Sequence, residues 1–294
     1  MSPPVSLTTP WSRATNLRAP VVNAPMGGAA GGRLAAAVSR AGGLGMVGMG
    51  SSATPEELSA ELREVADLGL PFGIGLVHWV IGAQPRLFEV ALAARPAVLS
   101  VSFGDDWAWV AAAHAAGVRV ATQVGTVDGA LRAVDAGVDV LVARGAEGGG
   151  HGEPRVGTLP LLTEVLDRVD VPVLAAGGIA SARGLAAVLA AGASGAWLGT
   201  VFATCAEALT PPQARAALLA AAGDATVVTD EFDRAHGYAW PSTIPERVLR
   251  GADGRPVPVN AGQGVGMVTA APGAATLIEQ LCSGAEALLR TWSD

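Results

Sequence analysis

The stretch VDVLVARGAEGGGHGE, residues 138–153, decides the fold of this chain. Five of its first six residues are apolar, which is typical of a short strand buried on both faces of a parallel sheet. The strand runs into three consecutive glycines, Gly148, Gly149 and Gly150, whose backbone can press close against a flat ligand. His151 follows them, and histidine has the side-chain pKa closest to neutrality. A flexible loop with a solvent-facing histidine is the alternative, but the strand directly before the glycines favours a catalytic His151.

Short apolar runs alternate with alanine-rich helical stretches on both sides of this segment, which is the pattern of βα repeats. The strands are expected at residues 21–23, 44–47, 72–76, 98–103, 119–124, 138–143, 171–175 and 195–198. The helices are expected at residues 33–41, 54–68, 85–94, 107–116, 126–136, 159–169, 181–191 and 211–222. Eight repeats predict an α/β fold, a (β/α)8 TIM barrel that forms one domain over residues 1–294.

The repeat is lost after the eighth helix. Residues 223–260 carry His236, Tyr238, Trp240 and several prolines, and we interpret them as an excursion that can close over the barrel mouth. A plain surface loop is the alternative. Residues 269–290 place apolar side chains at helical spacing, which predicts a C-terminal helix.

Composition excludes several kinds of function. Half of the 294 residues are hydrophobic and 15% are charged, so a large core can be buried. The net charge of −7 argues against nucleic acid as a partner. All 19 basic residues are arginines, and the absence of lysine excludes Schiff-base aldolase and pyridoxal phosphate chemistry.

Neither a metal site nor a membrane partner is expected. The four histidines have no metal-ligand spacing, and Cys205 and Cys282 form no CxxC pair, which fits a reduced, cytoplasmic protein. The N-terminus has no signal-peptide pattern. Two uncharged runs, residues 68–85 and 184–206, contain turn residues that divide each into two short elements.

A phosphate site is expected after the last two strands. Gly177 and Gly178 follow the seventh strand, and Gly199 and Thr200 follow the eighth. In (β/α)8 barrels these two loops commonly bind phosphate through backbone N–H groups. Tight turns alone are the alternative interpretation of these glycines. Two further glycine patterns, residues 43–48 and 262–266, lack the strand and acidic residue of a Rossmann fingerprint.

Together these segments resemble the nitronate monooxygenase family, which consists of FMN-dependent (β/α)8 barrels. Residues 23–26, NAPM, resemble the family's first-strand motif, and residues 144–152, RGAEGGGHG, resemble its glycine motif with the catalytic histidine. Residues 176–179, 195–200 and 261–266 resemble its phosphate cradle and the segment before its last helix. The chain departs from the family at Arg144 and Trp197, where glutamines are usual, and at Gly75, where asparagine is usual.

The resemblance implies FMN as cofactor, a small-molecule substrate with O2, and His151 as the catalytic residue. It implies that the cofactor contacts are Ala24, Pro25, Met26, Gly75, Gln123, Arg144, Gly149, Gly177, Gly178, Leu198, Gly199 and Thr200. Arg144 is expected either to place a positive charge near the flavin or to form an ordinary surface salt bridge.

The reaction that this resemblance favours is oxidation of alkyl nitronates with O2. One alternative is an NAD(P)H-dependent flavin reductase that acts on quinones or enoyl thioesters, because such enzymes share the motifs. A non-catalytic flavin-binding protein is the other alternative, suggested by the changed residues at positions 75, 144 and 197.

Overall fold

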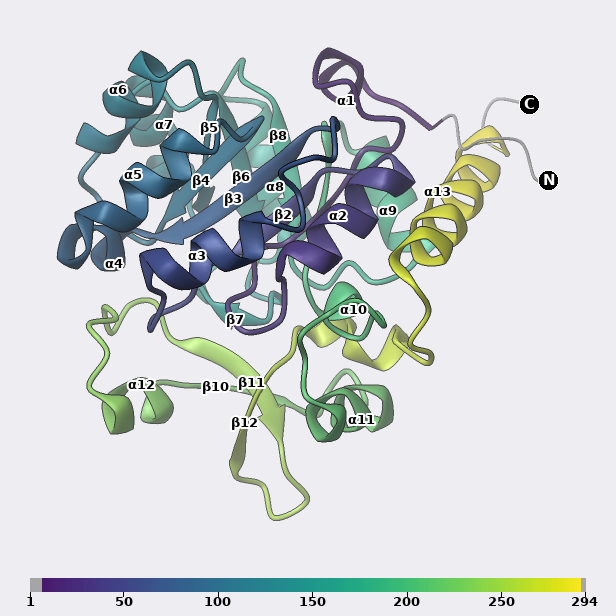
Figure 1. The fold of residues 1–294 in the computed structure, drawn as a ribbon. Helices are drawn as coiled ribbons and strands as arrows, with labels where there is room; N and C mark the ends of the chain where they lie inside the picture. The colour runs from purple at the N-terminus through teal and green to yellow at the C-terminus, as the bar shows by residue number, and fades with distance from the viewer. Residues whose placement is uncertain (1–6, 292–294) are drawn as a thin grey trace.

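The computed structural model describes residues 7–291 and shows a barrel of eight parallel strands surrounded by helices (Figure 1). The barrel strands are β1 (Val21–Asn23), β2 (Gly45–Gly48), β3 (Phe72–Val77), β4 (Val98–Ser102), β5 (Val120–Val124), β6 (Val140–Arg144), β8 (Val173–Ala176) and β9 (Gly195–Leu198). They pair in the order β1-β9-β8-β6-β5-β4-β3-β2, and a parallel bridge between Val22 and Leu44 joins the two ends. The predicted (β/α)8 barrel is therefore confirmed, with strand ends that differ by one or two residues.

Helices cover the outside of the barrel. They are α2 (Gly32–Ala41), α3 (Pro55–Leu62), α4 (His78–Ala83), α5 (Pro85–Ala93), α6 (Ala108–Ala115), α7 (Val127–Asp135), α8 (Thr158–Leu166), α9 (Ala182–Ala190) and α13 (Ala274–Arg290). Short helices α1 (Pro10–Ala14) and α10 (Thr200–Ala203), together with α11 (Pro212–Ala220), lie nearer the barrel ends. The sequence did not predict α1, α4 or α10, because each is too short to show a helical repeat.

Side-chain caps explain where several helices begin. Thr54 and Glu57 form a capping box at α3, Thr126 accepts a hydrogen bond from the Gly129 N–H at α7, and Ser181 caps α9 through the Gly184 N–H. The prediction of a helix over 54–68 was too long. After Leu62 the hydrogen bonds change to the shorter i to i+3 pattern, and the chain continues in turns.

The barrel has one core inside the strands and another between strands and helices. Val22, Met46, Val142, Leu174 and Trp197 belong to the cluster that fills the barrel interior. The larger outer cluster includes Leu34, Ile74, Leu99, Leu141 and Leu185. At β2 the contact with α2 is so close that a Cβ on Gly45 would lie 1.8 Å from the Ala35 carbonyl oxygen, so only glycine fits there.

Residues 223–260 fold into a second, antiparallel sheet, which the sequence did not predict. It contains β10 (Thr226–Thr229), β11 (Glu246–Arg250) and β12 (Pro256–Asn260), with α12 (Glu231–His236) between the first two strands. The glycine loop adds the two-residue strand β7 (Gly150–His151), which pairs with β11. Figure 1 shows this sheet on one side of the barrel, beside β7. The excursion is thus tied by backbone hydrogen bonds to the loop that carries His151.

The C-terminal helix begins at Ala274, five residues later than predicted. Pro272 and Gly273 precede it, and the Glu207 carboxylate accepts hydrogen bonds from the Ala274 N–H. The helix packs against α2 and α9. A 3-10 turn, η1 (Gln263–Met267), connects β12 to this region. None of the helices within residues 7–291 has the length and apolar character needed to span a membrane.

Candidate active site

A cavity of about 390 Å³ opens at the carboxyl ends of the barrel strands, where enzymes of this architecture bind their substrates. Its volume lies within the usual range for small-molecule sites. Its wall includes the loop after β1, the glycine loop, the loops after β8 and β9, and part of the excursion. Of the residues named from the sequence, it is lined by Ala24, Pro25, Met26, Gln123, Arg144, Gly149, His151, Gly177, Gly178, Gly199 and Thr200.

Two residues expected at the cofactor, Gly75 and Leu198, are absent from the cavity wall and lie behind it. A Cβ on Gly75 would come within 2.2 Å of Pro25 Cγ, so glycine at this point of β3 leaves room for the proline ring. The Leu198 carbonyl accepts a hydrogen bond from the Ala24 N–H at 2.8 Å. Both residues therefore support the loop after β1, which itself faces the cavity.

The loops after β8 and β9 form a cradle of backbone. Gly177 and Gly178 have φ values of +111° and +68°, which favour glycine strongly. Among the described residues, the N–H groups of Gly178 and Gly199 find no hydrogen-bond acceptor. Free N–H groups in glycine loops after the last two strands fit a phosphate group, as the sequence suggested.

The segment before η1 closes this cradle. The Gly262 N–H donates to Thr200 Oγ1 at 3.0 Å, and a Cβ on Gly264 would lie 2.5 Å from the Gly178 carbonyl oxygen. A Cβ on Gly149 would lie 2.5 Å from the Gly262 nitrogen. The three glycine segments thus converge at backbone distance, and larger residues would push them apart.

Arg144 is buried at the end of β6 and holds the glycine loop. Its Nη2 donates to the carbonyl oxygens of Gly148, Gly149 and Gly150 at 2.7, 3.3 and 3.0 Å. Burial, with a smaller contribution from the positive charge of Arg247, lowers the pKa of Arg144 to about 10. The expected alternative of a surface salt bridge is wrong, because the residue is 5% exposed and pairs with backbone carbonyls.

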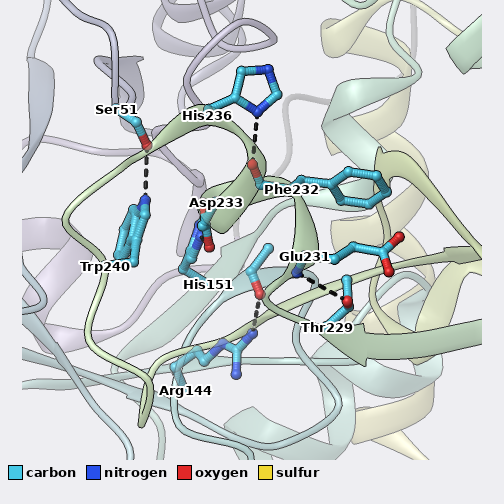
Figure 2. A network of polar contacts seen from close by, with 10 residues as sticks. Ser51, Arg144, His151, Thr229, Glu231, Phe232, Asp233, His236 and Trp240 are labelled. Carbon is cyan, nitrogen blue, oxygen red and sulfur yellow. Dashed lines mark hydrogen bonds and ion pairs between the residues drawn. The ribbon is translucent and has the colours of Figure 1, made fainter.

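His151 lies in the cavity wall between the barrel and the excursion. Its Nε2 is 2.9 Å from Oδ2 of Asp233 on α12, and both side chains are largely buried. Trp240 stacks on the imidazole, with ring centres 3.5 Å apart and planes within 4° (Figure 2). Burial lowers the pKa of His151, and the hydrogen bond and negative charge of Asp233 raise it in part.

Trp240 is itself fixed from the barrel side. Its Nε1 donates to Ser51 Oγ at 2.9 Å, as Figure 2 shows, and Phe103 packs edge-on against its ring at 4.9 Å. Phe103 also lines the cavity and has a φ of +73°, which is unusual for a non-glycine residue. The aromatic side chains thus form an apolar rim beside His151.

Glu246 forms a cluster of titratable side chains with Asp233 and His151. It faces His151 across the β7–β11 pair, and one ligand atom from each of the three residues lies within 4.8 Å of the others. Burial, and then the negative charge of Asp233, raise the pKa of Glu246 to about 7. These three residues are of the types that bind metal ions, whereas the sequence predicted no metal site. The hydrogen bond between His151 and Asp233 by itself accounts for the contact of these two side chains.

Asp233, Trp240, Glu246 and Phe103 were not identified from the sequence as site residues. Asp233 and Glu246 come from the excursion: Glu246 pairs with His151 across β11 and β7, and Asp233 contacts it from α12. The sole sequence signal was the aromatic content of residues 223–260, which includes Trp240. His236, which shares that segment, is exposed and lies 2.7 Å from the Phe232 carbonyl through Nδ1.

A barrel with a cradle of free backbone N–H groups and a histidine in one cavity is typical of flavin-dependent oxidoreductases. A sequence model described as nitronate monooxygenase matches residues 9–79 and 76–247. The chain belongs to the nitronate monooxygenase family, a family of oxidoreductases that use a flavin.

One relative and two solved structures show how far the similarity extends. The chain is 35% identical over 248 residues to a Mycobacterium tuberculosis (3aS,4S,5R,7aS)-5-hydroxy-7a-methyl-1-oxo-octahydro-1H-indene-4-carboxyl-CoA dehydrogenase, a match that covers 83% of this chain and 66% of that protein. FabK from Thermotoga maritima has a TM-score of 0.86 at 26% identity, covering 98% of this chain and 99% of that one. Nitroalkane oxidase from Streptomyces ansochromogenes has a TM-score of 0.83 at 28% identity, covering 96% and 100%.

Proposed function

We propose that the protein is an FMN-dependent oxidoreductase that oxidises alkyl nitronates with O2. The observation that carries this proposal is that His151 and the glycine cradle line one cavity. Membership of the nitronate monooxygenase family and the structural similarity to a nitroalkane oxidase support the substrate class.

FMN fits the residues that are present. Gly178, Gly199 and Thr200 offer backbone donors for a single terminal phosphate, and the chain has no Rossmann fingerprint for an adenosine half. The backbone of Ala24, Pro25 and Met26 provides a wall for a flat ring. When bound, FMN supplies the electron chemistry of the reaction.

The chain's own groups bind and orient the substrate. His151 would hold the negative charge of a nitronate when protonated, and it would accept a proton when neutral. Phe103 and Trp240 would pack against the alkyl part and exclude water. Arg144 keeps Gly148, Gly149 and Gly150 in place, and its charge next to the cavity would favour an anion there.

A second candidate is dehydrogenation of a carboxyl-CoA thioester. The name of the Mycobacterium tuberculosis relative indicates such a substrate for that protein. The observation in this chain that favours it is the apolar rim of Phe103 and Trp240, which would suit a fused-ring hydrocarbon. A reductase that takes electrons from NAD(P)H is a further outcome that the same assay would reveal.

An oxygen electrode distinguishes these functions. Oxygen uptake by the purified protein should start when propyl-2-nitronate is added, and it should need neither NADH nor a thioester. Uptake that depends on NADH would instead indicate a flavin reductase. Flavin reduction by a cyclic acyl-CoA, with no response to nitronate, would favour the thioester dehydrogenase. Bound FMN that none of these compounds reduces would mean a non-catalytic flavin-binding protein.

A further inference from the structure

The excursion supplies His151 with a buried carboxylate. Asp233 is 6% exposed, its Oδ2 lies 2.9 Å from His151 Nε2, and α12 carries it to the cavity from 82 residues further along the chain. Few Asp side chains are buried without a hydrogen-bonding or charged partner. The single side-chain partner of Asp233 within residues 7–291 is His151. The contact is therefore the reason for this burial.

The hydrogen bond decides which imidazole nitrogen is free. An ionised carboxylate only accepts hydrogen bonds, so Asp233 holds the proton of neutral His151 on Nε2. Nδ1 then carries the lone pair. Within the described part of the chain no donor contacts Nδ1, while His151 lines the cavity. The pair thus presents a proton acceptor, and not a donor, to a bound molecule.

The charges around His151 suit the same role. Asp233 and His236 come from α12, Glu246 from β11 and Arg144 from β6. The Arg144 guanidinium is occupied by the glycine carbonyls, and the Asp233 carboxylate is the nearest charge to the imidazole. An imidazolium formed at His151 would be stabilised by Asp233, whereas an anionic substrate gains nothing from that carboxylate.

We propose that Asp233 is a positioning residue: it holds the proton of neutral His151 on Nε2 and so leaves Nδ1 as the atom that accepts a proton from a neutral nitroalkane. In this step the C–H bond next to the nitro group breaks and an N–H bond forms at His151 Nδ1. The electron pair of the C–H bond becomes the C=N bond, and the negative charge moves to the nitro oxygens. The product is the nitronate, so the inference rests on the proposed function and adds a step before it.

The kinetic test uses the FMN-loaded protein with Asp233→Asn and Asp233→Glu. Asparagine can still accept the Nε2 hydrogen bond but has no charge. The rate of flavin reduction by nitroethane should therefore fall by about 10- to 100-fold, which is less than the loss expected on removing a general base altogether. Reduction by ethyl nitronate, which needs no proton removal, should fall by less than reduction by nitroethane does. Glutamate restores the charge and should recover part of the nitroethane rate. Because the loss lies in proton removal, it should appear in kcat more than in KM.

The acid limb of the nitroethane pH profile gives a second readout. Asp233 raises the pKa of His151, so the limb should move to lower pH in Asp233→Asn. Asp139→Asn is the matched control, because His114 and Asp139 form a pair of the same 2.9 Å length away from the cavity. That variant should leave the profile unchanged.

Nitrogen NMR of the histidines in the wild-type holoprotein tests the positioning without any activity. The His151 signal, identified by its loss in His151→Asn, should show a protonated Nε2 and a bare Nδ1 above its pKa. The opposite tautomer, or a His151 titration that Asp233→Asn leaves unchanged, would overturn the inference.

The two proposals can fail separately. A wild type that oxidises nitronate but leaves nitroethane untouched would refute this inference alone, as would equal losses with both substrates in Asp233→Asn. A wild type that oxidises neither compound would refute the proposed function, and the NMR measurement would still decide whether Asp233 positions His151.

Discussion

Replacing Arg144 tests whether this side chain acts through its geometry or only through its charge. Arg144→Gln removes two short charge-assisted hydrogen bonds, at 2.7 and 3.0 Å, each worth about 1.5–3 kcal/mol. It also removes a buried cation whose pKa falls from 12.5 to about 10, which corresponds to a burial cost of about 3 kcal/mol. The two effects largely offset each other, and we expect a net loss of about 1–2 kcal/mol in the free energy of unfolding.

Arg144→Lys separates the two explanations. Lysine keeps the buried charge, but its compact ammonium cannot reproduce the planar fork that spans the glycine carbonyls. We therefore expect Arg144→Lys to be at least as destabilised as Arg144→Gln, with a fall in melting temperature of about 2–4 °C for either variant. Arg86→Gln, an exposed arginine with one long surface ion pair, is the control and should change stability by less than about 0.5 kcal/mol.

Thermal unfolding of the three variants, followed by circular dichroism with FMN in excess, gives the comparison. A lysine variant as stable as the wild type, beside a destabilised glutamine variant, would show that charge alone matters. The three carbonyl contacts of Arg144 would then contribute nothing measurable to stability. In the same proteins, the flavin midpoint potential should fall in Arg144→Gln, because a cation next to the cavity is lost.

Three further changes probe other parts of the site. His151→Asn should keep the FMN spectrum but lower reduction by nitroethane about 10²–10⁴-fold in anaerobic stopped flow, with a smaller loss for the nitronate; equal rates would make His151 a bystander. Gly178→Leu should yield protein without FMN, since φ is +68° and a Cβ there would lie 3.1 Å from Glu147 Cβ, so the cradle backbone would have to move; normal FMN content after purification would remove the cradle from that role. Glu246→Gln should change the pH dependence of stability. Because the pKa of Glu246 is raised to about 7, the folded protein binds this proton more tightly than the unfolded chain does. The wild type therefore loses stability as pH rises from about 4.5 to 7. Melting temperatures at pH 5 and pH 8 should thus differ less in Glu246→Gln, and an identical pH dependence would show that Glu246 titrates normally.

The barrel could be predicted from sequence because each repeat has a recognisable local sequence pattern. A buried strand such as β6 is a continuous apolar run, and helices such as α3 begin with recognisable caps. The residues that line the cavity follow from that order, since the loops after parallel strands meet at one end of a barrel. Gly75 and Leu198 were expected at the cofactor because of the family resemblance, and the structure places both beside the loop after β1.

The remainder of the site depends on contacts that no local pattern encodes. The strands β10, β11 and β12 are short, β10 and β12 contain no fully buried residue, and no clear alternation of polar and apolar residues marks the three. Asp233 contacts His151 from α12, 82 residues further along the chain, and the pairing of β11 with β7 joins segments about 100 residues apart. The position of Arg144 was likewise unpredictable, because the same residue type at a strand end can face solvent, a cofactor or the glycine carbonyls.

The visible spectrum of the purified protein, recorded before and after propyl-2-nitronate is added without oxygen, tests the central claim most directly. We predict a yellow protein that releases FMN and not FAD when denatured, and whose flavin absorbance bleaches on addition of the nitronate and returns when air is admitted. A folded protein that takes up no FMN, or bound FMN that the nitronate leaves oxidised, would contradict the account.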